Sequence, residues 1–154
     1  MYKTMLSINK SVITPYTCEQ MYALVSDIEN YPQYLPWCPS SKVINQCGNK
    51  VTGRVDISYL KVKAHFTTLN TNYPNERIDV DLVDGPFKHL KGYWHFVALG
   101  ERGCKIEFKL DYKFSNFVIE KIIGAVFELV IKNIVDAFVK KAHQIYRAEN
   151  HVKN

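Results

Sequence analysis

Residues 104–114 read CKIEFKLDYKF, and residues 116–147 read NFVIEKIIGAVFELVIKNIVDAFVKKAHQIYR. In the first stretch apolar and charged residues alternate, which predicts a β-strand with one apolar and one charged face. In the second, apolar residues recur every three or four positions, which predicts a helix about 45 Å long with an unusually wide apolar face. Asn116 is placed to cap the start of that helix. Together the two stretches predict an antiparallel sheet packed against one long C-terminal helix.

The segment before this strand has the alternating pattern of a β-meander. From residue 41 to residue 114 the apolar residues follow a period of two, with turn signals near residues 48–49, 74–75 and 100–103. This spacing predicts about six antiparallel strands. Alternation places the following side chains on the apolar face: Val51, Val55, Ile57, Tyr59, Ala64, Phe66, Thr68, Ile78, Val80, Leu82, Leu90, Trp94 and Phe96.

The N-terminal part adds a strand and a short helix. Residues 3–13 have strand character, and Pro15 ends regular pairing before a helix that Thr17 and Gln20 open with a capping-box spacing. Residues 31–39, YPQYLPWCP, combine three prolines that interrupt helical continuity with four large apolar side chains. This last segment is too apolar for an ordinary surface loop.

The order of these elements indicates an α+β fold and a single domain over residues 1–154. A strand, a short helix, about six strands and a long helix describe a curved antiparallel sheet of about seven strands wrapped around the C-terminal helix. One helix cannot fill the concave side of such a sheet. We therefore expect an apolar tunnel between the helix and the sheet.

Aromatic residues make up 13% of the chain, as eight Phe, ten Tyr and two Trp. Such rings either fill a core or line a cavity, and for any single ring the core is the ordinary role. As a group they suit a cavity for a flat or isoprenoid hydrophobe. The candidates for its lining are Tyr34, Trp37, Tyr59, Phe66, Leu82, Phe87, Trp94, Phe96, Phe108, Phe127, Val130, Ile131, Ile134 and Phe138.

The sequence shows no constellation typical of catalysis or metal binding. Alternation turns His65, His95 and the acids at residues 79–81 away from the apolar face. Residues 79–85, DVDLVDG, resemble a calcium loop but lack its spacing and its distal Glu. The four cysteines have no zinc-site spacing, and motifs for nucleotide or serine hydrolysis are missing. We therefore expect no catalytic residue, no metal and no enzymatic activity.

The chain carries 20 Lys and Arg against 15 Asp and Glu, a formal net charge of +5. This balance permits a polyanionic partner, but no run of Lys or Arg marks one, and a soluble basic surface explains it as well. Charges interrupt the apolar run of the last helix, so we expect no transmembrane segment. The first residues, MYKTMLSINK, lack an apolar stretch of signal-peptide length, so we expect a cytoplasmic protein with reduced thiols.

Five motifs spread along the chain carry a family resemblance. They are VITPYTCEQMY at 12–22, YPQYLPWC at 31–38, FTT at 66–68, LVDGPFK at 82–88 and DAF at 136–138. In these motifs the chain resembles the ribosome association toxin RatA family, which belongs to the START-like, helix-grip superfamily together with the mitochondrial coenzyme Q-binding proteins. The resemblance covers roughly residues 5–147, and LVDGPFK, its most specific part, favours the bacterial ribosome-associated branch.

The resemblance implies a START-like helix-grip fold and two kinds of partner. Members of the bacterial branch bind the large ribosomal subunit, block its joining to the small subunit and act as toxins of a two-gene system, which implies an antitoxin protein. This interpretation makes the chain a non-enzymatic inhibitor of translation initiation. Its contacts to RNA phosphates would use exposed cations such as Lys88, Lys91, Lys140 and Lys141.

Members of the mitochondrial branch bind ubiquinone in the tunnel and support respiration, so a carrier of ubiquinone or another isoprenoid lipid is the second interpretation. The two are compatible because the surface and the tunnel are separate. Neither requires a cofactor, and neither has DNA as a partner. A cyclase or aromatase, found elsewhere among START-like folds, is a third interpretation, which the lack of an inward acid–base pair disfavours.

Overall fold

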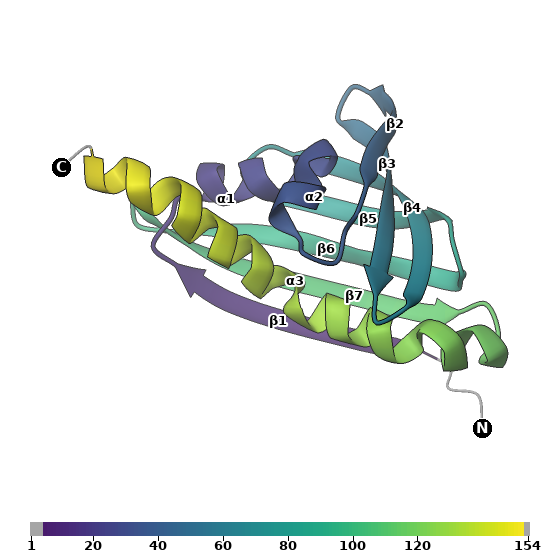
Figure 1. Ribbon diagram of the computed structural model, residues 1–154. Coiled ribbons are helices and arrows are strands. Elements are labelled where there is room, and N and C mark those ends of the chain that lie inside the picture. Colours follow the sequence, from purple (N-terminus) through teal and green to yellow (C-terminus); the bar gives the residue numbers. More distant parts are fainter. Residues whose placement is uncertain (1–4, 153–154) are drawn as a thin grey trace.

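The computed structural model describes residues 5–152. One antiparallel sheet of seven strands, in the order β1-β7-β6-β5-β4-β3-β2, forms its centre. The sheet curves around the long helix α3, and the shorter helices lie on the same side of the sheet (Figure 1). The predicted α+β helix-grip architecture is therefore confirmed. The elements are β1 (Leu6–Thr14), α1 (Cys18–Val25), the 3-10 helix η1 (Ile28–Asn30), α2 (Tyr31–Tyr34), β2 (Ser41–Cys47), β3 (Lys50–Tyr59), β4 (Val62–Tyr73), β5 (Arg77–Asp84), β6 (Phe87–Leu99), β7 (Gly103–Phe114) and α3 (Phe117–Val152).

Strand β1 pairs with β7, the last strand of the chain. Leu6 lies opposite Tyr112, and Thr14 lies opposite Cys104. The predicted first strand is present with its end moved by one residue, while positions 3 and 4 lie outside the described residues. Because β1 extends the meander at its β7 edge, it places the start of α1 next to the first residues of β7.

The capping box at the start of α1 is present as predicted. The backbone N–H of Gln20 donates to Oγ1 of Thr17, and the backbone N–H of Thr17 donates to Oε1 of Gln20, each at 3.0 Å. Two N–H groups that the helix cannot pair internally are thereby satisfied. The helix begins at Cys18 and buries Met21 and Val25 in the core.

Helix α3 crosses the concave side of the sheet from end to end (Figure 1). The backbone N–H of Ile119 donates to Oδ1 of Asn116 at 2.9 Å, so Asn116 caps the helix as predicted. The helix continues to Val152, past the predicted end at residue 147. Its wide apolar surface exceeds what the sheet covers, since Val118 and Ile122 are 62% and 61% exposed. The buried side chains of α3 include Ile123, Phe127, Val130, Ile131, Val135, Phe138 and Ala142.

The close pairing of β6 with β7 depends on Gly92. A Cβ atom at this position would lie 2.1 Å from the carbonyl oxygen of Lys109, far inside any non-bonded contact distance. Gly92 lies opposite Leu110, in the regular part of the ladder that runs from residue 89 to residue 99 of β6. The two backbones can approach this closely because residue 92 has no side chain.

Candidate functional site

An apolar cavity lies between the concave face of the sheet, helix α3 and the segment that joins α1 to β2. Its volume is about 70 Å³, roughly half of the ~150 Å³ of an engineered cavity that binds benzene. The predicted space between helix and sheet is therefore a small cavity in this structure. It is lined by Ile28, Tyr31, Trp37, Gly53, Val55, Phe66, Thr68, Asn70, Val80, Leu90, Trp94, Phe108, Leu110, Phe127, Ile131 and Ile134.

Strand alternation supplies the sheet side of the cavity. On β7, Phe108 and Leu110 point inward and are each 4% exposed, whereas Lys109 between them points outward. Trp94 of β6 lies directly opposite Phe108, with ring centroids 4.4 Å apart. The two rings form a continuous aromatic surface under the cavity.

Phe127 of α3 joins the cavity to an aromatic cluster. Its ring centroid lies 4.9 Å from those of Phe87 and Tyr112, 5.9 Å from that of Phe114 and 6.0 Å from that of Phe66. Most of these contacts are edge-to-face, the arrangement that the ring quadrupoles favour. This cluster fixes α3 against β4, β6 and β7 and fills the space beside the cavity.

The segment between α1 and β2 closes the cavity on the side away from the sheet. The hydroxyl of Tyr31 donates to the carbonyl of Val25, and the backbone N–H of Ser58 donates to the carbonyl of Trp37 at 2.9 Å. Pro32 lies in the first turn of α2, where a missing N–H costs nothing, so the segment forms one helical turn between its prolines. Burial raises the pKa of the Tyr31 phenol far above its ordinary value, which keeps the ring neutral.

The polar atoms of the cavity are few. Oγ1 of Thr68 donates to Oδ1 of Asn70 at 2.9 Å on β4. Among the described residues that line the cavity, Tyr31 alone carries an ionisable side chain. The cavity is therefore suited to an apolar molecule with one hydrogen-bonding group, and its lining holds no pair of groups for acid–base catalysis.

Seven of the fourteen residues that the sequence predicted for the lining do line this cavity. They are Trp37, Phe66, Trp94, Phe108, Phe127, Ile131 and Ile134. Phe87, Phe96, Val130 and Phe138 are buried in the core next to it. Leu82 is half-buried and packs against the core from β5, and Tyr34 is half-buried and donates its hydroxyl to Oδ2 of Asp27 at 2.8 Å.

Tyr59 lies outside the cavity, contrary to the prediction. By alternation it belongs to the same face of β3 as Val55 and Ile57, but its side chain is 40% exposed. Tyr59 ends β3 at a tight turn in which Leu60 and Lys61 have positive φ angles of 49° and 67°. Alternation assigns a residue to a face of the sheet, and it does not tell how far along the strand that face is covered.

Four lining residues were not predicted from the sequence. Ile28 and Tyr31 enter from short helical turns whose position depends on tertiary packing. Gly53 leaves the space that the Ile28 side chain occupies. Asn70 follows Phe66 and Thr68 at the strand period of two, so alternation was the signal that could have found it.

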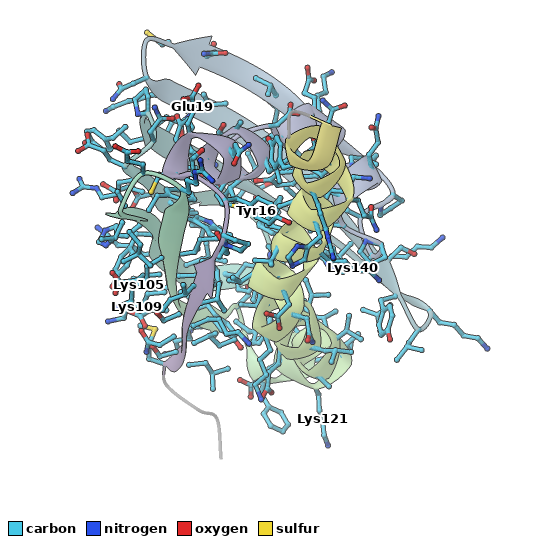
Figure 2. All side chains as sticks on the ribbon, turned by 90° about the vertical axis from the view of Figure 1, so that its left-hand side faces the viewer. Tyr16, Glu19, Lys105, Lys109, Lys121 and Lys140 are labelled. Atoms are coloured by element: carbon cyan, nitrogen blue, oxygen red, sulfur yellow. The ribbon has the colours of Figure 1, made fainter. Side chains whose placement is uncertain are left out.

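The lysines proposed for RNA contact lie on different faces. Lys91 projects from the outer face of the sheet and pairs with Asp81 at 3.6 Å. Lys140 projects from α3 on the other side of the molecule (Figure 2), and Nζ of its neighbour Lys141 lies 6.0 Å from the ring centroid of Tyr34. Lys88 is exposed on β6. The four cations therefore do not form one patch.

The outer face of β5, β6 and β7 carries a second, polar hollow of about 460 Å³. Tyr93 and His95 stack there with ring centroids 4.0 Å apart. Lys105 and Lys109 of β7 project from this side, away from α3 (Figure 2). Neither lysine has an ion pair within the described part of the chain. The charged ladder of residues 104–114 was visible in the sequence, but its position beside two aromatic rings was not.

Across residues 5–152, three or more His, Cys, Asp or Glu side chains do not come together in a way that could hold a metal ion. Within the same residues, each helix is too short or too polar to cross a membrane.

Comparison with known proteins shows which family this chain belongs to. Residues 14–139 match the family described as "Polyketide cyclase / dehydrase and lipid transport". The chain is 42% identical, over 144 residues, to the ribosome association toxin RatA of Escherichia coli strain K12, a match that covers 94% of this chain and 91% of that protein. The chain belongs to the RatA family. The predicted resemblance is thereby confirmed.

Two further comparisons concern proteins more distant from this chain. A mitochondrial coenzyme Q-binding protein, COQ10 homolog B of Xenopus laevis, is 29% identical over 92% of this chain and 59% of its own length. The Zhui aromatase/cyclase from Streptomyces sp. R1128 has the same fold, with a TM-score of 0.84 over 95% of this chain and 98% of its own, at 14% identity. At that identity the second comparison shows the fold alone.

The most specific RatA-like motif, LVDGPFK at residues 82–88, forms the turn from β5 to β6. Gly85 has a φ of 149°, and a Cβ atom there would lie 2.9 Å from Cβ of Phe66. The turn therefore requires a glycine, and it places Phe87 against Phe66 with ring centroids 6.2 Å apart. In this RatA-family chain the motif places Phe87 in the core beside the cavity, while Val83, Asp84 and Lys88 are exposed.

Proposed function

We propose that this protein binds the large ribosomal subunit and prevents it from joining the small subunit, and that it does so without catalysis. The observation that supports this most is the 42% identity to a ribosome association toxin over nearly the whole chain. The cavity is consistent with a non-enzymatic role, because its lining lacks an acid–base pair. A cytoplasmic location and an antitoxin partner belong to the same proposal.

The outer face of the sheet is the surface that we propose for ribosomal RNA. Lys105 and Lys109 have no ion pair within the described chain and project from one face of β7, so they can contact phosphates without first breaking a salt bridge. The stacked rings of Tyr93 and His95 line the polar hollow together with Lys109 and offer a surface on which an unpaired base can stack. Helix α3, with Lys140, is the competing surface.

Sucrose-gradient sedimentation of purified subunits tests the proposal. Excess protein should reduce the peak of joined ribosomes and should sediment with the large subunit. The double variant Lys105→Glu/Lys109→Glu should lose most of this effect, and the matched double variant Lys140→Glu/Lys141→Glu should keep it. The opposite result would move the surface to α3, and an unchanged peak with the wild-type protein would refute ribosome binding itself.

A second proposed function is the carriage of ubiquinone or a similar isoprenoid lipid. It is supported by the apolar cavity and by the relative named as a coenzyme Q-binding protein. A cavity of about 70 Å³ is smaller than a quinone ring needs, so loading would require the segment around Tyr31 and Trp37 to move. Mass spectrometry of lipids extracted from the purified protein tests this. Extracts without quinone or lipid would argue against it.

A further inference from the structure

Two cysteines far apart in the sequence meet at the start of α1. Sγ of Cys18 lies 2.9 Å from Sγ of Cys104. The contact follows from the pairing of β1 with β7, which places Thr14 opposite Cys104. Four residues later α1 begins, and its first residue is Cys18. Both sulfurs are free thiols.

The two thiols differ in accessibility. Cys18 is half-buried and is the first residue of helix α1. Cys104 is fully buried, and desolvation, followed by the hydrogen bond to Cys18, raises the pKa of its thiol. An oxidant in solution should therefore reach Cys18 first, and the sulfur of Cys104 lies in contact with the sulfur of Cys18.

We propose that Cys18 and Cys104 form a modification site that a hydroperoxide converts to a disulfide. In the first step the Cys18 thiol gives up its proton and its sulfur attacks the peroxide. The O–O bond breaks, one oxygen stays on sulfur as the Cys18 sulfenic acid, and the other leaves as hydroxide, which takes up the proton to become water. In the second step Cys104 loses its proton and attacks Sγ of Cys18, the S–O bond breaks, and a second water leaves. Two thiols are thus oxidised by two electrons and one hydrogen peroxide is reduced to two waters.

The geometry suits this bond. A disulfide needs its sulfurs about 2.05 Å apart, so the observed 2.9 Å requires a movement of less than about 1 Å. The other two thiols are placed differently. Cys47 is exposed on β2, and Cys38 is buried in the segment between α2 and β2, so neither competes for Cys104.

The disulfide would join the start of α1 to β7 across 86 residues of chain. Helix α1 leads directly into the segment with Ile28, Tyr31 and Trp37 that closes the cavity. The bond would therefore restrain one end of that segment. It would also stabilise the fold by lowering the conformational entropy of the unfolded chain. The proposal does not depend on ribosome binding or on quinone binding.

Mass spectrometry of the full chain tests the proposal. The reduced protein is treated with equimolar hydrogen peroxide, remaining thiols are alkylated after unfolding, and the digest is analysed without reductant. A Cys18–Cys104 linked peptide as the main product supports the proposal, with the same result from the control variant Cys47→Ser. Cys18 recovered as sulfinic acid, or any outcome in which Cys104 is still alkylated, overturns it.

Thermal unfolding gives a second measurement on the same samples. The oxidised wild-type protein should have a Tm about 5–10 °C above that of the reduced protein, and reductant should reverse the shift. Peroxide should leave the Tm of Cys18→Ser unchanged. An oxidised wild-type protein whose Tm equals or falls below that of the reduced form would overturn the proposed stabilisation.

Discussion

Trp37 and Trp94 line the same cavity, although one lies in the loop after α2 and the other on β6. They are the two tryptophans of the chain. Trp94 also contacts Phe138 of α3, with ring centroids 5.6 Å apart. The intrinsic fluorescence of this protein therefore reports on the cavity from two sides, the segment between α1 and β2 and the sheet.

Quinone binding should quench this fluorescence. A ubiquinone with a short isoprenoid tail that enters the cavity comes within contact distance of both indoles, so we expect saturable quenching of more than about half of the emission. Trp37→Phe and Trp94→Phe should each retain part of the quenching. Emission that falls only linearly with quinone, as for free tryptophan in solution, would contradict the carrier function.

Phe127→Ala should destabilise the protein by about 3–5 kcal/mol, because a buried ring that contacts four other rings is replaced by a void. Urea denaturation measures the loss. Leu129→Ala on the same helix is the matched control, since Leu129 is 42% exposed, and its effect should stay within about 0.5 kcal/mol. Equal losses for both variants would mean that Phe127 does not anchor α3.

Gly92→Ala should destabilise the protein by at least about 2 kcal/mol, since the new Cβ atom would collide with the Lys109 carbonyl on the neighbouring strand. Gly124→Ala on α3 is the control with the opposite sign. Its Cβ atom would lie 3.5 Å from Cγ of Glu120, an ordinary contact, so helix propensity should stabilise the protein by about 0.5–1 kcal/mol. Thermal unfolding would distinguish the two, and a tolerated Gly92→Ala would show that β6 and β7 can separate.

Thiol reactivity should separate Cys47 from Cys38. Burial, with a contribution from the Asp56 charge, raises the pKa of the Cys38 thiol to about 11. At pH 8 only about one Cys38 in a thousand is then a thiolate, whereas Cys47 is exposed. Alkylation at pH 8 should therefore modify Cys47 rapidly and Cys38 slowly, with Cys38 accelerating as the pH rises toward 11. Equal rates at pH 8 in the folded protein would contradict this burial.

The sequence alone predicts the fold well where short-range periodicity decides the structure. The alternation in residues 104–114 predicts β7, and the capping residues Thr17 and Asn116 mark the starts of two helices. The site is predicted less completely. Alternation assigns Tyr59 to the inward face of β3, yet its side chain is exposed. Tyr31 lies in a proline-rich segment and still lines the cavity.

The sequence by itself determined the α+β order of elements, the faces of the strands and the family, because each depends on residues that are neighbours along the chain. Only the tertiary structure decided which rings meet around the cavity, how large it is, and that Cys18 lies against Cys104. These features depend on strand pairing across the chain and on how far α3 and the short helices cover the sheet. Distances of that kind are set by packing, which no local pattern of residues encodes.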